Sequence, residues 1–228
     1  MTYDSTLARI IDHTLLKPDA TLRQIDQLCQ EALDFQFASV CINPCYIKQS
    51  ATRLKDSQVK VCTVIGFPLG ATLTEQKSFE TTLAIARGAE EIDMVMNIGM
   101  LKSGEFQYVK NDIRSVVQVA KSSGALVKVI LETALLDEEE KARACSLALE
   151  AGADFVKTST GFAKSGATTA DVRLMRSIVG DTMGVKASGG IKTYQDAVAM
   201  VQSGANRLGT SSGIVIVTGG TMAQSPAY

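Results

Sequence analysis

Short apolar runs alternate along the chain with longer segments in which apolar residues recur at helical spacing. Eight short runs are rich in strand-forming residues and predict strands near residues 12–16, 37–42, 60–66, 91–96, 127–132, 154–158, 184–187 and 206–209. A single helical face between the first two strands holds Leu22, Ile25, Cys29 and Ala32. This pattern is typical of repeated βα units, in which each amphipathic helix covers a strand of a parallel sheet.

Residues at the expected helix ends agree with these elements. Asp137 precedes three glutamates, which predicts a capped helix start with negative charge in its first turn. Thr72 and Glu75 have capping-box spacing and predict a second helix start. Three glycines stand shortly before predicted strands, and we expect each to end a helix in the left-handed conformation: Gly88, Gly152 and Gly204.

Eight βα units in 228 residues predict an α/β fold of the (β/α)8 or TIM barrel type, formed by a single domain over residues 1–228. An open, doubly wound sheet is the alternative. No G-x-G-x-x-G motif opens a helix after the first predicted strand, which argues against the dinucleotide-binding form of that alternative. We expect a mobile tail from about residue 218.

Composition and charge narrow the classes of partner. Lys and Arg number 23 against 24 Asp and Glu, so the net charge is -1, and no global field favours nucleic acid or an acidic membrane. No apolar run approaches membrane-spanning length, and the N-terminus does not resemble a secretory signal. Five cysteines without a CxxC pair indicate reduced thiols, so we expect a cytoplasmic protein.

The chain contains one histidine, His13. A zinc site with several imidazoles is therefore excluded, and a serine-histidine triad is limited to that one position. Asp12 and His13 together are either a buried polar pair that supports a site or a junction before the first strand.

Charged side chains occur where several predicted strands should end: Asp93, Glu132, Lys157 and Lys186. In a strand, Lys157 shares a face with Phe155, so it can point into a barrel. Burial and a second lysine nearby would both favour the neutral amine, which attacks carbonyl groups to form Schiff bases. A neighbouring carboxylate, with Asp93 the leading candidate, can handle the accompanying proton transfers.

A structural role for these lysines is equally compatible with the spacing. They could form ion pairs with Asp93 or Glu132, or extend their amines to solvent. A third strand lysine, Lys128, lies at the start of its strand, away from the expected catalytic end, and we treat it as structural.

Two loops rich in small residues follow the seventh and eighth predicted strands, at residues 188–190 and 209–213. Small residues allow backbone N–H groups to approach a phosphate, and this pair of loops is the recurrent phosphate site of (β/α)8 barrels. Either loop alone could be a flexible connection that needs glycine for its geometry. Their corresponding positions favour a phosphate site, to which Lys192 could add charge.

Seven motifs in conserved order resemble bacterial deoxyribose-phosphate aldolases: DHTLL (12–16), VCINP (40–44), IGFPLGA (65–71), EIDMVMNIG (91–99), FVKTSTGF (155–162), GVKASGGI (184–191) and NRLGTSSG (206–213). The resemblance extends from about residue 7 to about residue 217. It implies a (β/α)8 barrel and an enzyme of the lyase class that needs neither metal nor cofactor. The implied reaction is reversible cleavage of 2-deoxy-D-ribose 5-phosphate to acetaldehyde and D-glyceraldehyde 3-phosphate.

The resemblance also implies roles for individual residues. Lys157 resembles the lysine that forms the imine, and Lys186 the second lysine that perturbs it and relays protons. Asp93 resembles the acid that takes part in proton transfer, and Asp12 a supporting acid near Lys186. The remaining matched positions bind substrate: Cys41, Thr160, Gly161, Gly189, Gly190, Ser211 and Ser212.

Two features depart from the family pattern. Lys192 stands where many relatives have arginine, and an ammonium lacks the planar fork of donors that suits phosphate. The C-terminal tail is dissimilar except for its terminal Tyr228, whose role in proton transfer stays open.

Other functions are compatible with the same residues. The rival enzymes are another imine-forming barrel aldolase or a transaldolase, and the rival of a different class is a noncatalytic sugar-phosphate binding barrel. Relatives are often dimers, and an exposed apolar helix face could serve as such an interface.

Overall fold

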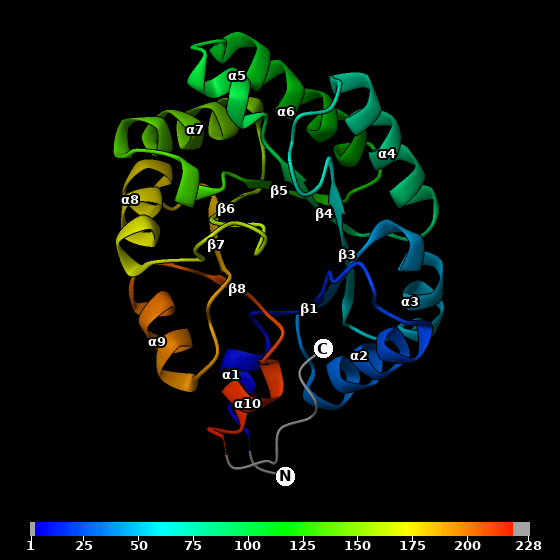
Figure 1. Cartoon of the computed structure of the whole chain (residues 1–228). Helices are drawn as coiled ribbons and strands as arrows, with labels where there is room; N and C mark the ends of the chain where they lie inside the picture. The colour runs from blue at the N-terminus through cyan, green and yellow to red at the C-terminus, as the bar shows by residue number, and fades with distance from the viewer. Residues whose placement is uncertain (1–2, 221–228) are drawn as a thin grey trace.

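The computed structural model describes residues 3–220 and forms a closed barrel of parallel strands inside a ring of helices (Figure 1). The strands follow one another around the barrel in chain order, and β1 pairs with β8 to close it. The predicted (β/α)8 barrel is therefore confirmed. The expected tail lies largely outside the described residues, and Tyr228 does so entirely.

All eight predicted strands are present, each with one or both ends shifted by one or two residues. Their bounds are β1 Ile11–Leu15, β2 Ser39–Ile42, β3 Lys60–Ile65, β4 Glu91–Val95, β5 Leu126–Ile130, β6 Phe155–Lys157, β7 Gly184–Ser188 and β8 Arg207–Thr210. Pairing registers place Lys157 beside Lys186, and Ser188 beside Gly209. The candidate lysines are thus neighbours on adjacent strands.

Helices occupy the outer layer and the ends of the barrel (Figure 1). Their bounds are α1 Ser5–Ala8, α2 Leu22–Phe35, α3 Ile47–Arg53, α4 Thr74–Ala86, α5 Ile98–Lys102, α6 Phe106–Lys121, α7 Glu138–Ala151, α8 Thr169–Val179, α9 Tyr194–Gln202 and α10 Gly213–Val217. Two short 3-10 helices, η1 Pro44–Tyr46 and η2 Thr133–Leu135, lie in the connections. No helix in residues 3–220 has the length and apolar character needed to cross a membrane.

The helix ends follow the sequence signals with one exception. Asp137 caps α7 in a capping box with Glu140, as predicted. Gly88, Gly152 and Gly204 all have positive φ at helix ends, which also confirms the prediction. The expected start at Thr72 is wrong: α4 begins at Thr74, and the side chain of Gln76, rather than Glu75, accepts a hydrogen bond from the backbone N–H of Leu73.

The apolar core lies mainly between the strands and the surrounding helices, where one continuous cluster includes Ile25 of α2, Val116 of α6 and Val129 of β5. The inside of the barrel is different. Inward positions that commonly hold branched apolar residues in this fold here carry buried charged groups. A charged barrel interior is costly to bury, and its arrangement defines the candidate site.

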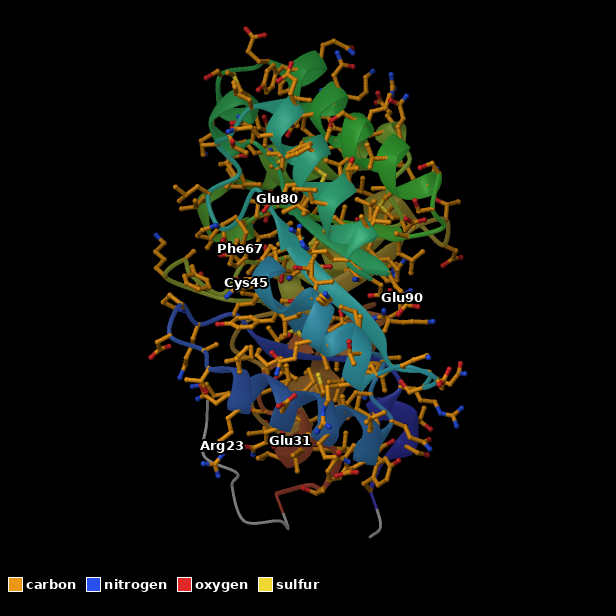
Figure 2. The ribbon with its side chains drawn as sticks, turned by 90° about the vertical axis from the view of Figure 1, so that its right-hand side faces the viewer. Arg23, Glu31, Cys45, Phe67, Glu80 and Glu90 are labelled. Atoms are coloured by element: carbon orange, nitrogen blue, oxygen red, sulfur yellow. The ribbon has the colours of Figure 1, made fainter. Side chains whose placement is uncertain are left out.

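The two ends of the barrel are distinguished in Figure 2. Phe67 and Cys45, which follow β3 and β2, lie toward one side of that view, and Glu90, which precedes β4, lies toward the other. The side with Phe67 is the carboxyl end of the strands, where active sites of this fold are built.

Candidate active site

Asp93, an inward residue of β4, is the centre of the charged cluster. Its Oδ2 accepts hydrogen bonds from Nζ of Lys157 on β6 and from Nζ of Lys186 on β7, each at 2.7 Å. Its Oδ1 accepts from Nζ of Lys128 on β5 at 2.9 Å. One fully buried carboxylate therefore holds the amines of three neighbouring strands.

A second set of charged groups supports this centre. Asp12 of β1 forms an ion pair with Lys186 and accepts a hydrogen bond from Nε of Arg207 at 2.8 Å. Glu91 of β4 lies 2.5 Å from Nζ of Lys128 and also pairs with Arg207. The predicted position of Asp12 near Lys186 matches this geometry.

The electrostatics keep most of these groups charged. Burial disfavours the carboxylate of Asp93, but Lys128, Lys157 and Lys186 outweigh that effect and hold its pKa well below the ordinary value. Burial likewise disfavours the ammonium of Lys186, yet Asp12 and Asp93 outweigh it and raise its pKa. Lys186 thus stays an ammonium, and its charge, rather than a free amine, is what it offers to the site.

Charge is not balanced within the cluster. Four cationic side chains, those of Lys128, Lys157, Lys186 and Arg207, face three carboxylates, those of Asp12, Glu91 and Asp93. One net positive charge remains when every group is ionised. Loss of a single proton from one amine would balance the cluster.

A pocket of about 410 Å³ opens above the cluster at the carboxyl ends of β1, β6, β7 and β8. Lys157 lines this pocket, whereas the side chains of Lys128 and Lys186 are completely buried below it. Of the three amines around Asp93, only that of Lys157 combines contact with the acid and access to the pocket. Lys157 is therefore the amine placed to react with a ligand.

Much of the pocket wall is formed by residues at and after the ends of β6, β7 and β8, together with residues 14–18. Residues 160–162, 188–192 and 209–212 line it, so they include the predicted positions Thr160, Gly161, Gly189, Gly190, Ser211 and Ser212. At Gly190 φ is +79°, and no atom lies within 4 Å of the place where a Cβ would stand. Lys192 also lines this wall. The loops are thus shaped to let a ligand approach the backbone.

Gly209 makes room for the lysines. A Cβ at Gly209 would stand 2.3 Å from Oγ of Ser188 and 3.0 Å from Cε of Lys186. A side chain at this position of β8 would therefore overlap Ser188 and crowd Lys186 beside Asp12 and Asp93.

Cys41 differs from the expectation. It is completely buried, with Sγ 4.0 Å from Oδ2 of Asp93, and it is not among the residues that line the described pocket. Its short side chain on β2 ends at the level of Asp93 and does not reach the pocket wall.

Lys128 also differs from the expectation that it lies away from the site. It occupies the middle of β5, and its long side chain carries Nζ to Oδ1 of Asp93. The prediction considered only the position of Lys128 in its strand and neglected the length of its side chain, whose four methylene groups carry the amine to Asp93. Lys128 still has no access to the pocket, so a structural role is consistent with its position.

The acids and thiols of the cluster also have metal-ligand spacing. Cys41, Cys62 and Asp93 form one such group, and Asp12, Cys62 and Glu91 another. Nζ of Lys128 already lies 3.5 Å from Sγ of Cys62 and within hydrogen-bonding distance of both Asp93 and Glu91. These ligands therefore already surround an ammonium.

Three charged residues of the site were missed or assigned other partners at the sequence level. Glu132 was considered as a partner of the lysines, but its Oε2 instead accepts from Thr160. Glu91 and Arg207 were not considered. Strand alternation could have found both, since Glu91 lies two residues before Asp93 and Arg207 two before Gly209.

Comparisons with known proteins agree with this geometry. A family model described as DeoC/LacD family aldolase matches residues 6–218. The deoxyribose-phosphate aldolase of Caldanaerobacter subterraneus subsp. tengcongensis is 59% identical over 212 residues, which cover 92% of each chain. The protein of the same name from a Geobacillus species is 60% identical over 218 residues, covering 96% of this chain and 97% of the relative.

Solved structures show the same similarity. A structure titled as a putative deoxyribose-phosphate aldolase from Coccidioides immitis has a TM-score of 0.91 and 46% identity, covering 94% of this chain and 85% of the other. The tetrameric deoxyribose phosphate aldolase of Aeropyrum pernix has a TM-score of 0.87 and 39% identity, covering 93% and 90%. With the family model spanning nearly the whole chain, the protein belongs to the DeoC/LacD family of aldolases.

Proposed function

We propose that this protein is a metal-independent deoxyribose-phosphate aldolase, a lyase that reversibly cleaves 2-deoxy-D-ribose 5-phosphate to acetaldehyde and D-glyceraldehyde 3-phosphate. The observation that carries the proposal is that Lys157 alone joins the Asp93 cluster to the pocket. Close relatives that bear this name support the choice of substrate. We further propose that residues 1–228 act as one domain.

The reaction begins when Nζ of Lys157, without its ammonium proton, attacks C1 of the open-chain sugar. Release of that proton removes the excess positive charge of the cluster. A proton supplied by the ammonium of Lys186 allows the hydroxyl of the adduct to leave as water, which gives a protonated imine that acts as an electron sink.

Carbon-carbon cleavage follows from that imine. The C3 hydroxyl gives up its proton, its electrons form the aldehyde of glyceraldehyde 3-phosphate, and the C2–C3 bond electrons pass to the imine and leave an enamine. Asp93 lies beside Lys157 as a carboxylate placed to accept this proton, and the ammonium of Lys186, which also contacts Asp93, is placed to return one to the enamine carbon. Hydrolysis then releases acetaldehyde and restores Lys157.

The phosphate is proposed to lie against Gly190, Ser211 and the neighbouring loop residues, which line the same pocket as Lys157. Backbone and hydroxyl donors suit phosphate oxygens, and Lys192 contributes a positive charge.

Reductive trapping tests the role of Lys157. Acetaldehyde with borohydride should leave one ethyl group on the peptide that contains Lys157, as measured by peptide mass spectrometry, and Lys157→Ala should abolish both this adduct and turnover. An adduct on Lys186, or wild-type turnover by a folded Lys157→Ala variant, would show that the assignment is wrong.

A substrate pair tests the phosphate site. Ser211→Ala combined with Gly190→Ala should lower kcat/KM for deoxyribose 5-phosphate by about tenfold or more, because the first change removes a hydroxyl donor to a charged group and the second strains a backbone with φ at +79°. Unphosphorylated deoxyribose should be much less affected. Equal losses on both sugars would count against this placement.

We also propose a homodimer in the cytoplasm. Phe79 and Leu83, four residues apart on α4, are exposed large apolar side chains and support an apolar interface.

The five cysteines are all unpaired, which supports a reducing compartment. Sedimentation of the wild type beside Phe79→Lys tests the assembly.

A further inference from the structure

Glu132 is a strained and buried acid beside the pocket. It follows β5 with φ at +57°, a left-handed backbone conformation that residues other than glycine seldom adopt. Glu132 is 3% exposed. Its Oε1 is buried with no hydrogen-bond partner in the described part of the chain. A backbone and an oxygen kept in unfavourable states indicate that Glu132 serves the site.

The other oxygen of Glu132 fixes the hydroxyl of Thr160. Oε2 accepts a hydrogen bond from the backbone N–H of Thr160 at 3.2 Å, and it is also bonded to Oγ1 of Thr160. In the second bond the threonine hydroxyl is the donor, because a carboxylate oxygen has no proton to donate. The single hydroxyl proton of Thr160 therefore points toward Glu132 and away from the pocket.

The remaining capacity of Thr160 can be counted. A threonine hydroxyl has one proton and two lone pairs. The backbone N–H of Phe162 donates to Oγ1 at 3.0 Å and uses one lone pair. One lone pair is left, on a residue that lines the pocket. Thr160 can therefore accept one hydrogen bond from a ligand and cannot donate one while Glu132 holds its proton.

We propose that Glu132 is a positioning residue that makes Thr160 an acceptor for the C4 hydroxyl of the sugar phosphate. This inference rests on the proposed function. Thr160 stands three residues beyond Lys157 and next to Gly161, between the reactive amine and the phosphate-binding loops. The C3 hydroxyl must give its proton to the groups around Asp93, which leaves the C4 hydroxyl, between C3 and the phosphate, to donate to Thr160.

The synthetic direction gives a direct test, because acceptor aldehydes with and without this hydroxyl can be compared. The 2-hydroxyl of D-glyceraldehyde 3-phosphate becomes the C4 hydroxyl of the product, and 3-oxopropyl phosphate lacks it. We would measure kcat and KM for both acceptors with acetaldehyde. The proteins would be the wild type, Glu132→Leu, Glu132→Gln, Thr160→Val and the double variant Glu132→Leu with Thr160→Val.

The expected result is a loss confined to the hydroxylated acceptor. Glu132→Leu and Thr160→Val should each lower its kcat/KM by about 10- to 100-fold, whereas 3-oxopropyl phosphate should change less than about threefold. Glu132→Gln keeps an amide oxygen that can accept both hydrogen bonds, so it should retain the wild-type preference. The double variant should have a kcat/KM no lower than that of the less active single variant, because both substitutions remove the same interaction.

Several results would overturn the inference. Equal losses on both acceptors would reduce Glu132 to a general structural role. Should Glu132→Leu not fold, Thr160→Val alone decides the matter, and a wild-type acceptor preference in that variant contradicts the proposal. A wild-type protein that converts neither acceptor would instead refute the proposed function, an outcome that these variants cannot mimic.

Discussion

At the scale of single residues, the site depends on one carboxylate that serves three amines. The contacts of Asp93 explain why Lys157 and Lys186 can lie on neighbouring strands without separating under mutual repulsion. The same contacts bring Asp93, the proposed proton carrier, to within 2.7 Å of Nζ of Lys157, the proposed reactive nitrogen. In the proposed mechanism, the structural and chemical roles therefore coincide at Asp93.

Asp93→Asn separates these roles. An amide cannot carry the proton, so turnover should fall by about 10²- to 10⁴-fold in a coupled assay of glyceraldehyde 3-phosphate release. It also removes the carboxylate that pairs with Lys157 and leaves Lys128 and Lys186 with Glu91 and Asp12 alone, so the free energy of unfolding in urea should fall by about 3–5 kcal/mol.

A cap residue provides the control for Asp93→Asn. Asp137→Asn makes the same chemical change at the exposed start of α7, where asparagine is also a good cap, so turnover and stability should stay near wild type. An Asp93→Asn variant with undiminished turnover would remove Asp93 from the proposed mechanism.

The sequence predicted the reactive residues better than their partners. Lys157, Lys186 and Asp93 are conspicuous because charges interrupt apolar strands. Arg207 escaped, and the partner of Glu132 was predicted wrongly, because these contacts join different segments of the barrel: Arg207 contacts Asp12 and Glu91, and Glu132 contacts Thr160. Such pairings depend on barrel closure and register, which periodicity in one segment does not contain.

At the scale of elements, the close approach of β7 and β8 sets the position of Lys186. Serine 188 and Lys186 both face the barrel interior, and Gly209 on the paired strand leaves the space that they occupy. The small residue is thus required by its neighbours as well as by any ligand.

Gly209→Ala tests this requirement. The added Cβ would overlap Oγ of Ser188 and crowd Lys186, so we expect a loss of about 1–3 kcal/mol in the free energy of unfolding together with a lower kcat. Gly99→Ala on α5 is the matched control, because its Cβ would meet only Asn97 at an ordinary 3.7 Å. Similar behaviour of the two variants would show that the space beside Gly209 is not needed.

Element boundaries also show what local signals can specify. Asp137 and Glu140 satisfy each other within four residues, so the start of α7 is encoded locally. At α4, the Thr72–Glu75 spacing suggests one helix start, but the capping hydrogen bond is made by Leu73 and Gln76. The observed start at Thr74 is accompanied by a hydrogen bond from Thr74 to Asp112 on α6. Long-range contacts of this kind are not visible in a capping motif.

At the scale of the whole molecule, the charged interior links stability to pH. The pKa of Asp93 and that of Asp12 lie below their ordinary values because of the neighbouring cations, which outweigh burial. Their contribution to stability is therefore fully present above the unfolded pKa of about 3.9 and is lost as pH falls through the lower folded values. The pKa values of Lys128 and Lys186 are raised, so these residues act at the alkaline end of the pH range. Their contribution to stability is fully present below the unfolded lysine pKa of about 10.4 and is lost as pH rises through the higher folded values.

Urea unfolding across pH checks this account. The free energy of unfolding of the wild type should decrease as pH falls below about 4, and Asp93→Asn should show a weaker decrease because one depressed carboxyl has been removed. Identical pH dependence in the two proteins would indicate that Asp93 does not contribute to acid sensitivity.

The interlocked charges inside the barrel also constrain how this enzyme can change. Replacing any one member takes a charged partner from its neighbours in the buried interior, so viable variants should arise as compensating sets rather than as isolated substitutions. Gly190, Ser211 and Ser212 on the pocket wall carry no charge and take no part in these ion pairs. Directed evolution toward new aldehydes should therefore accumulate substitutions among the loop residues that line the pocket and leave the buried charged cluster unchanged.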